Sequence, residues 1–467
     1  MWRLASRPLL RATMNRGILF NVASVTSQLT LRHFASLSSA FDSSMSPPLS
    51  SAWDQLTPAN QRLALTLTRE QPPADSHEAK DYRRIALSKA ITLCESKQVQ
   101  QHEQAALLLT HLLEQEQCRY ALSQSFRVGL AGAPGAGKST MIEALGLYIL
   151  EQSNLEKLNR NENDDEMDLT TITAKPTADE KKKVKKKPPI WRPDSLAVVC
   201  IDPSSGTTGG SILGDKTRMT ELSRNHDQVF VRPAPSGAGT LGGLATYTND
   251  VVTLCQCAGK YPLVLVETVG VGQSEVEVQE CVDYLIVLVP PAGGDDLQGV
   301  KKGIIEVADL VVVTKADGNL EKAATRTAAD YKGAMQFLHT MMGEQRGGGD
   351  ALRPQVLLAS SVTKRGLDII WQHVSQARSA LMNTPPTPSD DDDDAFWNAS
   401  NLLQQKRQKQ SKYWMWKNMQ LLVQERAKHD PLVHQTAKTL EQQLQQGRMT
   451  PRVAAQKLLD SLYTSIN

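Results

Sequence analysis

The stretch Gly132-Ala-Pro-Gly-Ala-Gly-Lys-Ser139 decides the fold of this chain. It fits the pattern G-x-x-x-x-G-K-[ST], in which glycines let the backbone curl so that several N–H groups converge on phosphate oxygens. An apolar run, 126–131, comes before it, and a helical pattern, 140–150, comes after it. Because the motif requires this order of strand, turn and helix, the sequence predicts a loop that binds the phosphates of a nucleotide.

This loop contains the residues expected to contact the phosphates and a metal ion. The Lys138 side chain is expected to reach the β- and γ-phosphates, and the Ser139 hydroxyl to ligate Mg²⁺. The amino end of the following helix adds a favourable dipole for an anion. The nucleotide-binding residues predicted here are Gly132, Ala133, Pro134, Gly135, Ala136, Gly137, Lys138, Ser139 and Thr140.

Five further apolar runs have the length of buried strands. They are nearly continuous Val, Leu and Ile, as is typical of strands covered on both faces of a parallel sheet. Helical patterns lie between them. The sequence therefore predicts an α/β fold, a doubly wound and mostly parallel sheet that binds ligands at the carboxyl ends of its strands. These runs are 196–201, 263–268, 284–289, 310–314 and 356–359.

Acidic residues follow two of these strands. Asp202 directly follows the run 196–201, and Glu267, near the end of the run 263–268, begins the sequence Glu-Thr-Val-Gly. Mg²⁺ prefers hard oxygen ligands, so Ser139, Asp202 and Glu267 are the candidate metal-binding residues. Further along, Asp215 is the candidate to orient the attacking water, with Arg218 nearby to stabilise developing charge. The candidate catalytic residues are thus Lys138, Asp215 and Arg218.

The sequence Thr314-Lys-Ala-Asp317 follows another strand and fits the guanine motif [NT]-K-x-D. The Asp317 carboxylate can accept hydrogen bonds from the ring N–H and the exocyclic amine of guanine. Adenine offers neither in that arrangement, so the motif predicts GTP and argues against an ATP-dependent kinase. The segment 360–362 follows the last strand, where the guanine carbonyl would be contacted. The base-binding candidates are Thr314, Lys315, Asp317, Ser360, Ser361 and Val362.

Two other patterns are better explained as structure. The run Gly237-Ala-Gly-Thr-Leu-Gly242 fits the dinucleotide fingerprint but lacks the acid that should follow about 20 residues later, so a turn and a helix start are favoured. Cys255 and Cys257 could bind a metal together. Two thiols do not complete a tetrahedral site, however, and both lie in the predicted helix 244–258. Burial inside that helix is the favoured interpretation.

The first 45 residues are rich in Arg and Ser, and their first acidic residue is Asp42. This composition is typical of a mitochondrial or plastid transit segment, and the Arg spacing favours mitochondria, which predicts a location in the mitochondrial matrix. An exposed basic tail is the alternative. The net charge of +2 provides no general attraction to nucleic acid or membrane. No apolar run approaches the roughly 20 residues that span a bilayer.

Composition divides the remainder. The predicted parts are a helical extension over 46–122, the nucleotide domain over 123–384, an acidic linker over 385–395 and a helical arm over 396–467. Within the domain, 154–192 joins an acidic block to a lysine run with few large apolar residues, which predicts a disordered insertion. The arm contains Tyr413-Trp-Met-Trp416 and packs either on another subunit or on its own domain; Gly447 and Thr450 mark helix ends within it.

Together these motifs resemble the MeaB/ArgK family of GTPases. The resemblance covers residues 80–465 without the insertion and the linker, and is most specific at 209–219, 267–274, 293–303 and 414–416. It implies a homodimer built through helical arms and slow hydrolysis of GTP to GDP with Mg²⁺. It also implies a partner, adenosylcobalamin-dependent methylmalonyl-CoA mutase, whose cofactor loading the GTPase gates and which it protects or reactivates.

The resemblance further implies a switch in the glycine-rich stretch 293–303. The switch residues that it suggests are Gly270, Gln298, Lys301 and Lys302. One departure is Thr314, which replaces the commoner Asn that ties the base loop to the phosphate loop, so some loss of affinity is expected. An alternative function is a nickel-type, metal-delivering GTPase, which would need a Cys/His cluster beyond Cys255 and Cys257. A scaffold that binds GTP without hydrolysing it is the weakest alternative.

Overall fold

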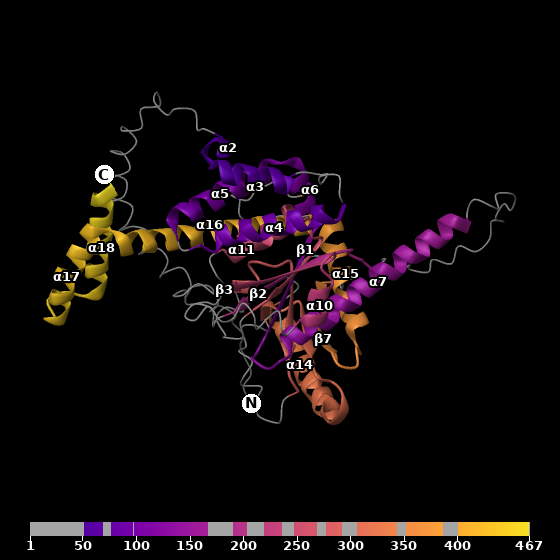
Figure 1. Cartoon of the computed structure of the whole chain (residues 1–467). Coiled ribbons are helices and arrows are strands. Elements are labelled where there is room, and N and C mark those ends of the chain that lie inside the picture. The colour runs from indigo at the N-terminus through magenta and orange to yellow at the C-terminus, as the bar shows by residue number, and fades with distance from the viewer. Residues whose placement is uncertain are drawn as a thin grey trace, which may run out of the picture. The chain divides into compact units, whose positions relative to one another are not determined.

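The structure is a computed structural model of the whole chain. Its described residues divide into two units: α2 (Ala52–Gln55) belongs to the first, which ends at Gln55, and the second begins at Leu56. The sheet and the other helices, which Figure 1 draws, belong to the second unit. The described ranges are 51–68, 76–96, 98–166, 190–202, 219–235, 247–268, 277–291, 306–342, 352–385 and 400–466.

The second unit is built on a sheet of seven strands in the order β3-β2-β4-β1-β5-β6-β7. Every strand pair in it is parallel. The predicted α/β fold is therefore confirmed, with the strand that leads into the phosphate-binding loop, β1, at the centre. The strands are β1 (Phe126–Gly132), β2 (Leu196–Asp202), β3 (Val229–Pro235), β4 (Leu263–Glu267), β5 (Tyr284–Val289), β6 (Leu310–Val313) and β7 (Gln355–Leu358).

Helices cover both faces of the sheet. On one face, α7 (Lys138–Glu166), α10 (Thr220–Arg224) and α15 (Leu367–Asn383) pack with alternate residues of the strands, among them Phe126, Val128 and Leu130 of β1. On the other face, α11 (Thr248–Cys257) contacts β4 and β2. Next to β6 and β7 lies α14 (Glu321–Met342), which follows the short η2 (Gly318–Leu320).

The predicted N-terminal helical extension forms four helices in the second unit. These are α3 (Pro58–Thr68), α4 (Ser76–Cys94), α5 (Val99–Glu114) and α6 (Glu116–Gln124), and the last three contact α11. The apolar stripe of α5 is buried, as the helical spacing of its residues requires. It consists of Ala105, Leu108, Leu109 and Leu112. The extension thus covers the α11 face of the domain.

The predicted insertion is shorter than 154–192 at both ends. Helix α7 continues to Glu166 because the added turns, although poor in apolar residues, contain residues with good helix propensity. At the other end, the Trp191 ring stacks on Trp371 with centroids 5.5 Å apart, and Trp371 Nε1 donates to the Trp191 carbonyl at 2.7 Å. Residues 167–189 lie outside the described residues, as do 1–45 and most of the predicted linker.

The C-terminal arm forms α16 (Leu402–His429), α17 (Pro431–Gln445) and α18 (Pro451–Ile466). The Asp430 side chain caps α17 by accepting from two backbone N–H groups, and Gly447, with φ of 67°, follows that helix. The Thr450 hydroxyl accepts from the Val453 N–H at 3.5 Å, so both helix ends predicted here are confirmed. Leu402 and Leu403 of α16 join the core of the domain.

Candidate functional site

The phosphate-binding loop follows β1 at the centre of the sheet and ends where α7 begins. Gly132, Gly135 and Gly137 have φ values of 148°, 80° and 88°, which residues with a side chain rarely adopt. Gly132 also has a steric role: a Cβ there would lie 2.3 Å from the Leu288 carbonyl oxygen of β5. A glycine is therefore required for the chain to turn out of the sheet at this point.

Lys138 begins α7 and folds back over the loop. Its Nζ donates to the carbonyl oxygens of Gly132 at 2.8 Å and of Ala133 at 3.3 Å. Within the loop, the Ala136 N–H donates to the Ala133 carbonyl at 3.1 Å. An ammonium group, the N–H groups of the first helical turn and the helix dipole thus meet on one short loop, an arrangement suited to a phosphate chain.

Ser139 and Glu267 come together beside this loop. The Ser139 hydroxyl donates to Glu267 Oε1 at 2.7 Å, and the Glu267 residue is 8% exposed. Glu267 ends β4, where the register places it opposite Leu130 of β1 and Cys200 of β2. The backbone of Asp202 ends β2 at the same edge of the sheet. A hydroxyl and a carboxylate held together fit a hard divalent cation such as Mg²⁺.

Thr314 joins the base loop to the phosphate loop. Its hydroxyl, in a residue that is 3% exposed, donates to the Ala136 carbonyl at 2.8 Å. It also lies 3.3 Å from the Val289 carbonyl. The tie that Asn usually makes between these loops is therefore present with Thr. A hydroxyl is shorter than an amide, but the two loops lie close enough for it to reach.

Asp317 and Ser360, two of the predicted base-binding residues, are joined by a hydrogen bond. The Ser360 hydroxyl donates to Asp317 Oδ2 and accepts from the Thr363 N–H at 3.1 Å. The Ala316 N–H donates to the Ala359 carbonyl at 3.0 Å, which aligns the ends of β6 and β7. Ser360 is fully buried, so its hydroxyl holds the Asp317 carboxylate in one orientation. A fixed carboxylate is what bidentate recognition of guanine needs.

The three other base-site candidates differ in their environments. Lys315 is exposed and adopts a φ of 53°. Val362 is 83% exposed, so it contributes a surface rather than a pocket wall. The Ser361 hydroxyl lies 3.8 Å from the Met141 sulfur of α7. The segment 360–362 is thus adjacent to the helix that follows the phosphate loop.

Several predicted site residues lie outside the described residues, as does the glycine run 237–242. For Asp202 the backbone is described and the side chain is not. The others are Asp215, Arg218, Gly270, Gln298, Lys301 and Lys302. Cys255 and Cys257 are buried in α11, as predicted, and all of the cysteines are free thiols. Over the described ranges, no group of three or more His, Cys, Asp or Glu side chains is placed to hold a metal ion.

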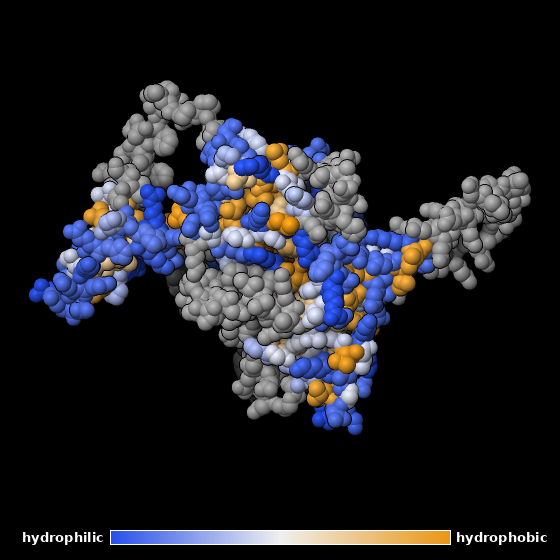
Figure 2. Space-filling view, in the orientation of Figure 1, coloured by the Kyte–Doolittle hydropathy of each residue, from blue (hydrophilic) through white to orange (hydrophobic). Residues whose placement is uncertain are grey.

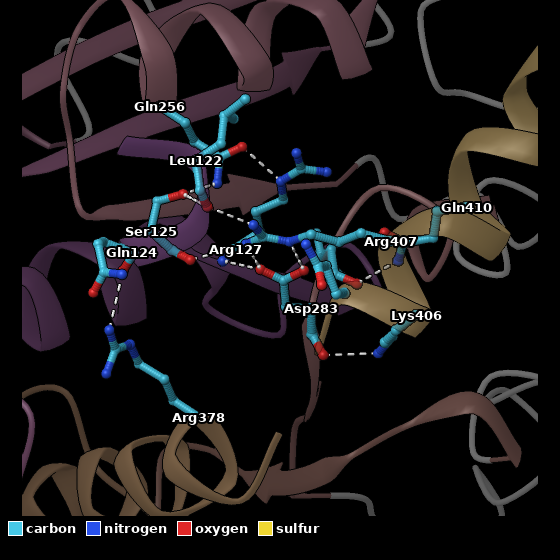
Figure 3. A network of polar contacts seen from close by, with 12 residues as sticks. Leu122, Gln124, Ser125, Arg127, Gln256, Asp283, Arg378, Lys406, Arg407 and Gln410 are labelled. Atoms are coloured by element: carbon cyan, nitrogen blue, oxygen red, sulfur yellow. Dashed lines mark hydrogen bonds and ion pairs between the residues drawn. The ribbon is translucent and has the colours of Figure 1, made fainter. Parts of the chain in front are cut away.

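A buried ionic network, which the sequence did not predict, connects α16 to the start of β1 and β5 (Figure 3). Arg407 of α16 donates to both carboxylate oxygens of Asp283, at 2.9 and 2.6 Å, and Asp283 Oδ2 accepts from the Arg127 N–H at 2.8 Å. Burial lowers the pKa of Arg127 to about 10, with Arg407 adding to the effect. The Arg127 guanidinium in turn donates to Gln256 Oε1 at 2.7 Å.

This geometry agrees with comparisons to known proteins. The family model described as "Methylmalonyl Co-A mutase-associated GTPase MeaB" matches residues 87–155 and 190–432, on both sides of the predicted insertion. A mouse protein named methylmalonic aciduria type A homolog, mitochondrial, is 38% identical over 381 residues, which are 81% of this chain and 76% of the relative. GTPase ArgK of Escherichia coli is 37% identical over 334 residues, or 71% and 78% of the two chains.

A solved structure shares the fold. The crystal structure of an LAO/AO transport system kinase aligns with a TM-score of 0.53 and 27% identity, covering 87% of this chain and 98% of that one. The matched segments of the family model contain the phosphate loop, the Glu267 strand end and the guanine motif in one series. The chain therefore belongs to the MeaB family of P-loop GTPases and hydrolyses GTP.

Proposed function

We propose that this GTPase is a chaperone of adenosylcobalamin-dependent methylmalonyl-CoA mutase, in which GTP binding and hydrolysis gate cofactor loading and protect or reactivate the mutase. The observation that carries the proposal is the match to a mutase-associated GTPase family on both sides of the insertion. The contacts of the predicted guanine motif support it, with Ser360 donating to Asp317 and Thr314 donating to Ala136. A nucleotide-driven shift between two conformations needs a specific nucleotide. Over the described residues, the metal-delivering alternative lacks a Cys/His cluster.

In this proposal each site residue has one role. Ser139, Asp202 and Glu267 hold Mg²⁺ directly or through water, and when bound the ion neutralises charge on the β- and γ-phosphates. Lys138 contacts the same phosphates from the start of α7. Outside the described residues, Asp215 orients the attacking water and Arg218 stabilises the charge that develops. The proposed switch residues are Gly270, Gln298, Lys301 and Lys302.

The proposal includes a homodimer formed through the C-terminal arm. Helix α16 exposes large apolar side chains between residues 413 and 423, and a cluster of such residues on a protein surface is typical of an interaction surface. They include Met415, Trp416, Met419, Leu422 and Val423. The proposed location is the mitochondrial matrix, which the names of the mouse and Caenorhabditis elegans relatives and the basic first 45 residues support. In the described part of the chain, no helix has the length and apolar character to cross a membrane.

The test is phosphate release from GTP with and without purified methylmalonyl-CoA mutase. Unassisted turnover should be slow, on the order of 10⁻⁴ to 10⁻² s⁻¹, and should rise when the mutase is added. Asp215→Asn should abolish hydrolysis and leave GTP affinity unchanged. If the mutase changes nothing while GTP is still hydrolysed, the client is wrong and the GTPase assignment stands.

A further inference from the structure

A short turn that leads into β5 is held by α16, the first helix of the C-terminal arm. This turn, residues 277–283, follows the Glu267 motif along the chain. Three of its carbonyl oxygens accept hydrogen bonds from α16: Gln410 Nε2 donates to Gln279 and Val282, both at 2.8 Å, and Trp414 Nε1 donates to Glu280 at 2.6 Å. We call it the α16-bound turn.

The other side of the α16-bound turn packs on the strand that leads to the phosphate loop. A Cβ at Gly129 of β1 would lie 3.0 Å from a Val282 methyl and 3.1 Å from a Val278 methyl. The Asp283 N–H donates to the Arg127 carbonyl at 2.9 Å, and the Arg127 N–H donates to the Asp283 carboxylate at 2.8 Å. The turn therefore lies between α16 and the centre of β1.

The contact of the turn with α16 and its contact with β1 are both tightly packed. Gln410 and Trp414 are each 4% exposed, and the valines that face Gly129 are fully buried. The Lys417 ammonium forms an ion pair with the Glu277 carboxylate at the first residue of the turn. Because protein interiors are close-packed, the turn cannot shift against β1 without moving or breaking its contacts to α16.

We propose that Gln410 and Trp414 are positioning residues of the GTPase: from α16 they hold the turn against β1, so the preference for GTP over GDP depends on α16. The inference uses guanine nucleotide binding and does not depend on the mutase. Coupling of this kind is reciprocal, so the bound nucleotide also changes how firmly α16 is held. The C-terminal helices thereby acquire sensitivity to the nucleotide state.

The test compares Gln410→Leu and Trp414→Phe with the control Lys412→Ala, an exposed residue of the same helix. The first variant removes the donor to two carbonyls; the second keeps a buried ring and removes one N–H. The dissociation constants of GDP and of a non-hydrolysable GTP analogue are measured for each. Both variants should change the ratio of the two constants by about fivefold or more, and the control should keep the wild-type ratio.

A merely structural anchor gives a different result. It would lower the melting temperature of both variants and leave the ratio of nucleotide affinities unchanged, which would overturn the proposal. Hydrogen exchange on the unsubstituted chain provides a test that no folding defect can obscure. Backbone amides of 402–420 should exchange at different rates with GDP and with the GTP analogue, and identical rates would refute the coupling. Neither measurement includes the mutase, so failure here leaves the client proposal untouched.

Discussion

At the scale of single residues, Thr314 shows how one hydroxyl can link two binding loops. Its bond to the Ala136 carbonyl joins the end of β6 to the phosphate loop. The loss of affinity expected from replacing Asn assumes that this tie is broken, and the structure contains the tie. The guanine motif could be recognised from the sequence. The hydrogen bond could not be predicted, because the two residues that it links lie far apart in the chain.

Replacing Thr314 by Val keeps the shape of the side chain and removes this bond. A typical hydrogen bond contributes about 0.5–1.5 kcal/mol, so GTP affinity should fall by roughly two- to tenfold. The measurement is equilibrium titration with a fluorescent GTP analogue. Thr325→Val is the matched control, because its hydroxyl bonds only within its own helix, to the Glu321 carbonyl at 2.9 Å. Equal affinity losses in both variants would contradict a specific tie.

Asp317 permits a test of base recognition by changing the ligand. Inosine triphosphate lacks the exocyclic amine of guanine, so it should lose one charge-assisted hydrogen bond to the carboxylate. Such a bond is worth about 1.5–3 kcal/mol, which predicts roughly ten- to a hundredfold weaker binding than GTP. In Asp317→Ala the two nucleotides should bind with similar, weak affinity. If the variant still prefers GTP to the same extent, another residue reads the amine.

At the scale of elements, the sequence predicted six of the seven strands and missed β3. Its apolar run, 229–231, is short, and Pro233 and Pro235 follow it, which argues against a central strand. The structure places β3 at an edge, paired only with β2, where proline is tolerated. The position of β3 at the edge depends on the order of the strands in space, and the local pattern of apolar residues and prolines does not reveal that order.

The helices were also predicted only in part, because one helix end was placed wrongly. The helical regions were predicted, but the end of α7 at Glu166 was not. The exposed part of that helix presents Leu155 and Leu158 among polar residues, and apolar patches lie along it in Figure 2. A surface helix without a full apolar stripe gives a weak periodic signal, so the boundary between helix and insertion was placed too early.

The turn from β1 into the phosphate loop can be tested by comparing two glycines. Gly132→Ala should destabilise the protein strongly, because the added methyl would meet the Leu288 carbonyl of a central strand at 2.3 Å. Gly135→Ala meets no atom within 4 Å and should cost only the strain of its positive φ, about 1–2 kcal/mol. Urea denaturation measures both.

Both variants change the phosphate loop, so GTP binding alone does not separate steric from conformational effects. The unfolding free energies do, since only Gly132 has a neighbouring strand in its way. Similar losses for the two variants would mean that backbone strain, and not the contact with β5, makes glycine necessary at Gly132.

At the scale of the whole second unit, the network around Asp283 holds α16 to the sheet. The Arg407 guanidinium also donates to the Leu122 and Ser125 carbonyls, at 2.6 and 2.9 Å, and Lys406 Nζ donates to the Asp283 carbonyl at 2.7 Å. Because these partners are distant in sequence, no motif records them. Motifs with a fixed local spacing were predictable here, and contacts made by long-range folding were not.

Asp283 should make the stability of the protein depend on pH. Burial raises the pKa of its carboxyl, but the charges and hydrogen bonds of Arg407, followed by Arg127, outweigh this and lower the pKa below its ordinary value. A carboxyl with a lowered folded-state pKa stabilises the protein above its unfolded pKa of about 3.9, and loses that contribution as the pH falls through this value toward the folded pKa.

Comparison with Asp283→Asn isolates this contribution. At pH 7 the variant should be less stable by about 3–5 kcal/mol, because the asparagine leaves Arg407 and Arg127 without their carboxylate. That difference should stay constant down to about pH 5 and shrink below about pH 4, as the carboxyl of the unfolded wild type becomes protonated. Urea denaturation at a series of pH values measures it, with Asp330→Asn, an exposed carboxylate on α14, as the control. A difference that persists undiminished as the pH falls to 3 would mean that packing, and not charge, makes Asp283 stabilising.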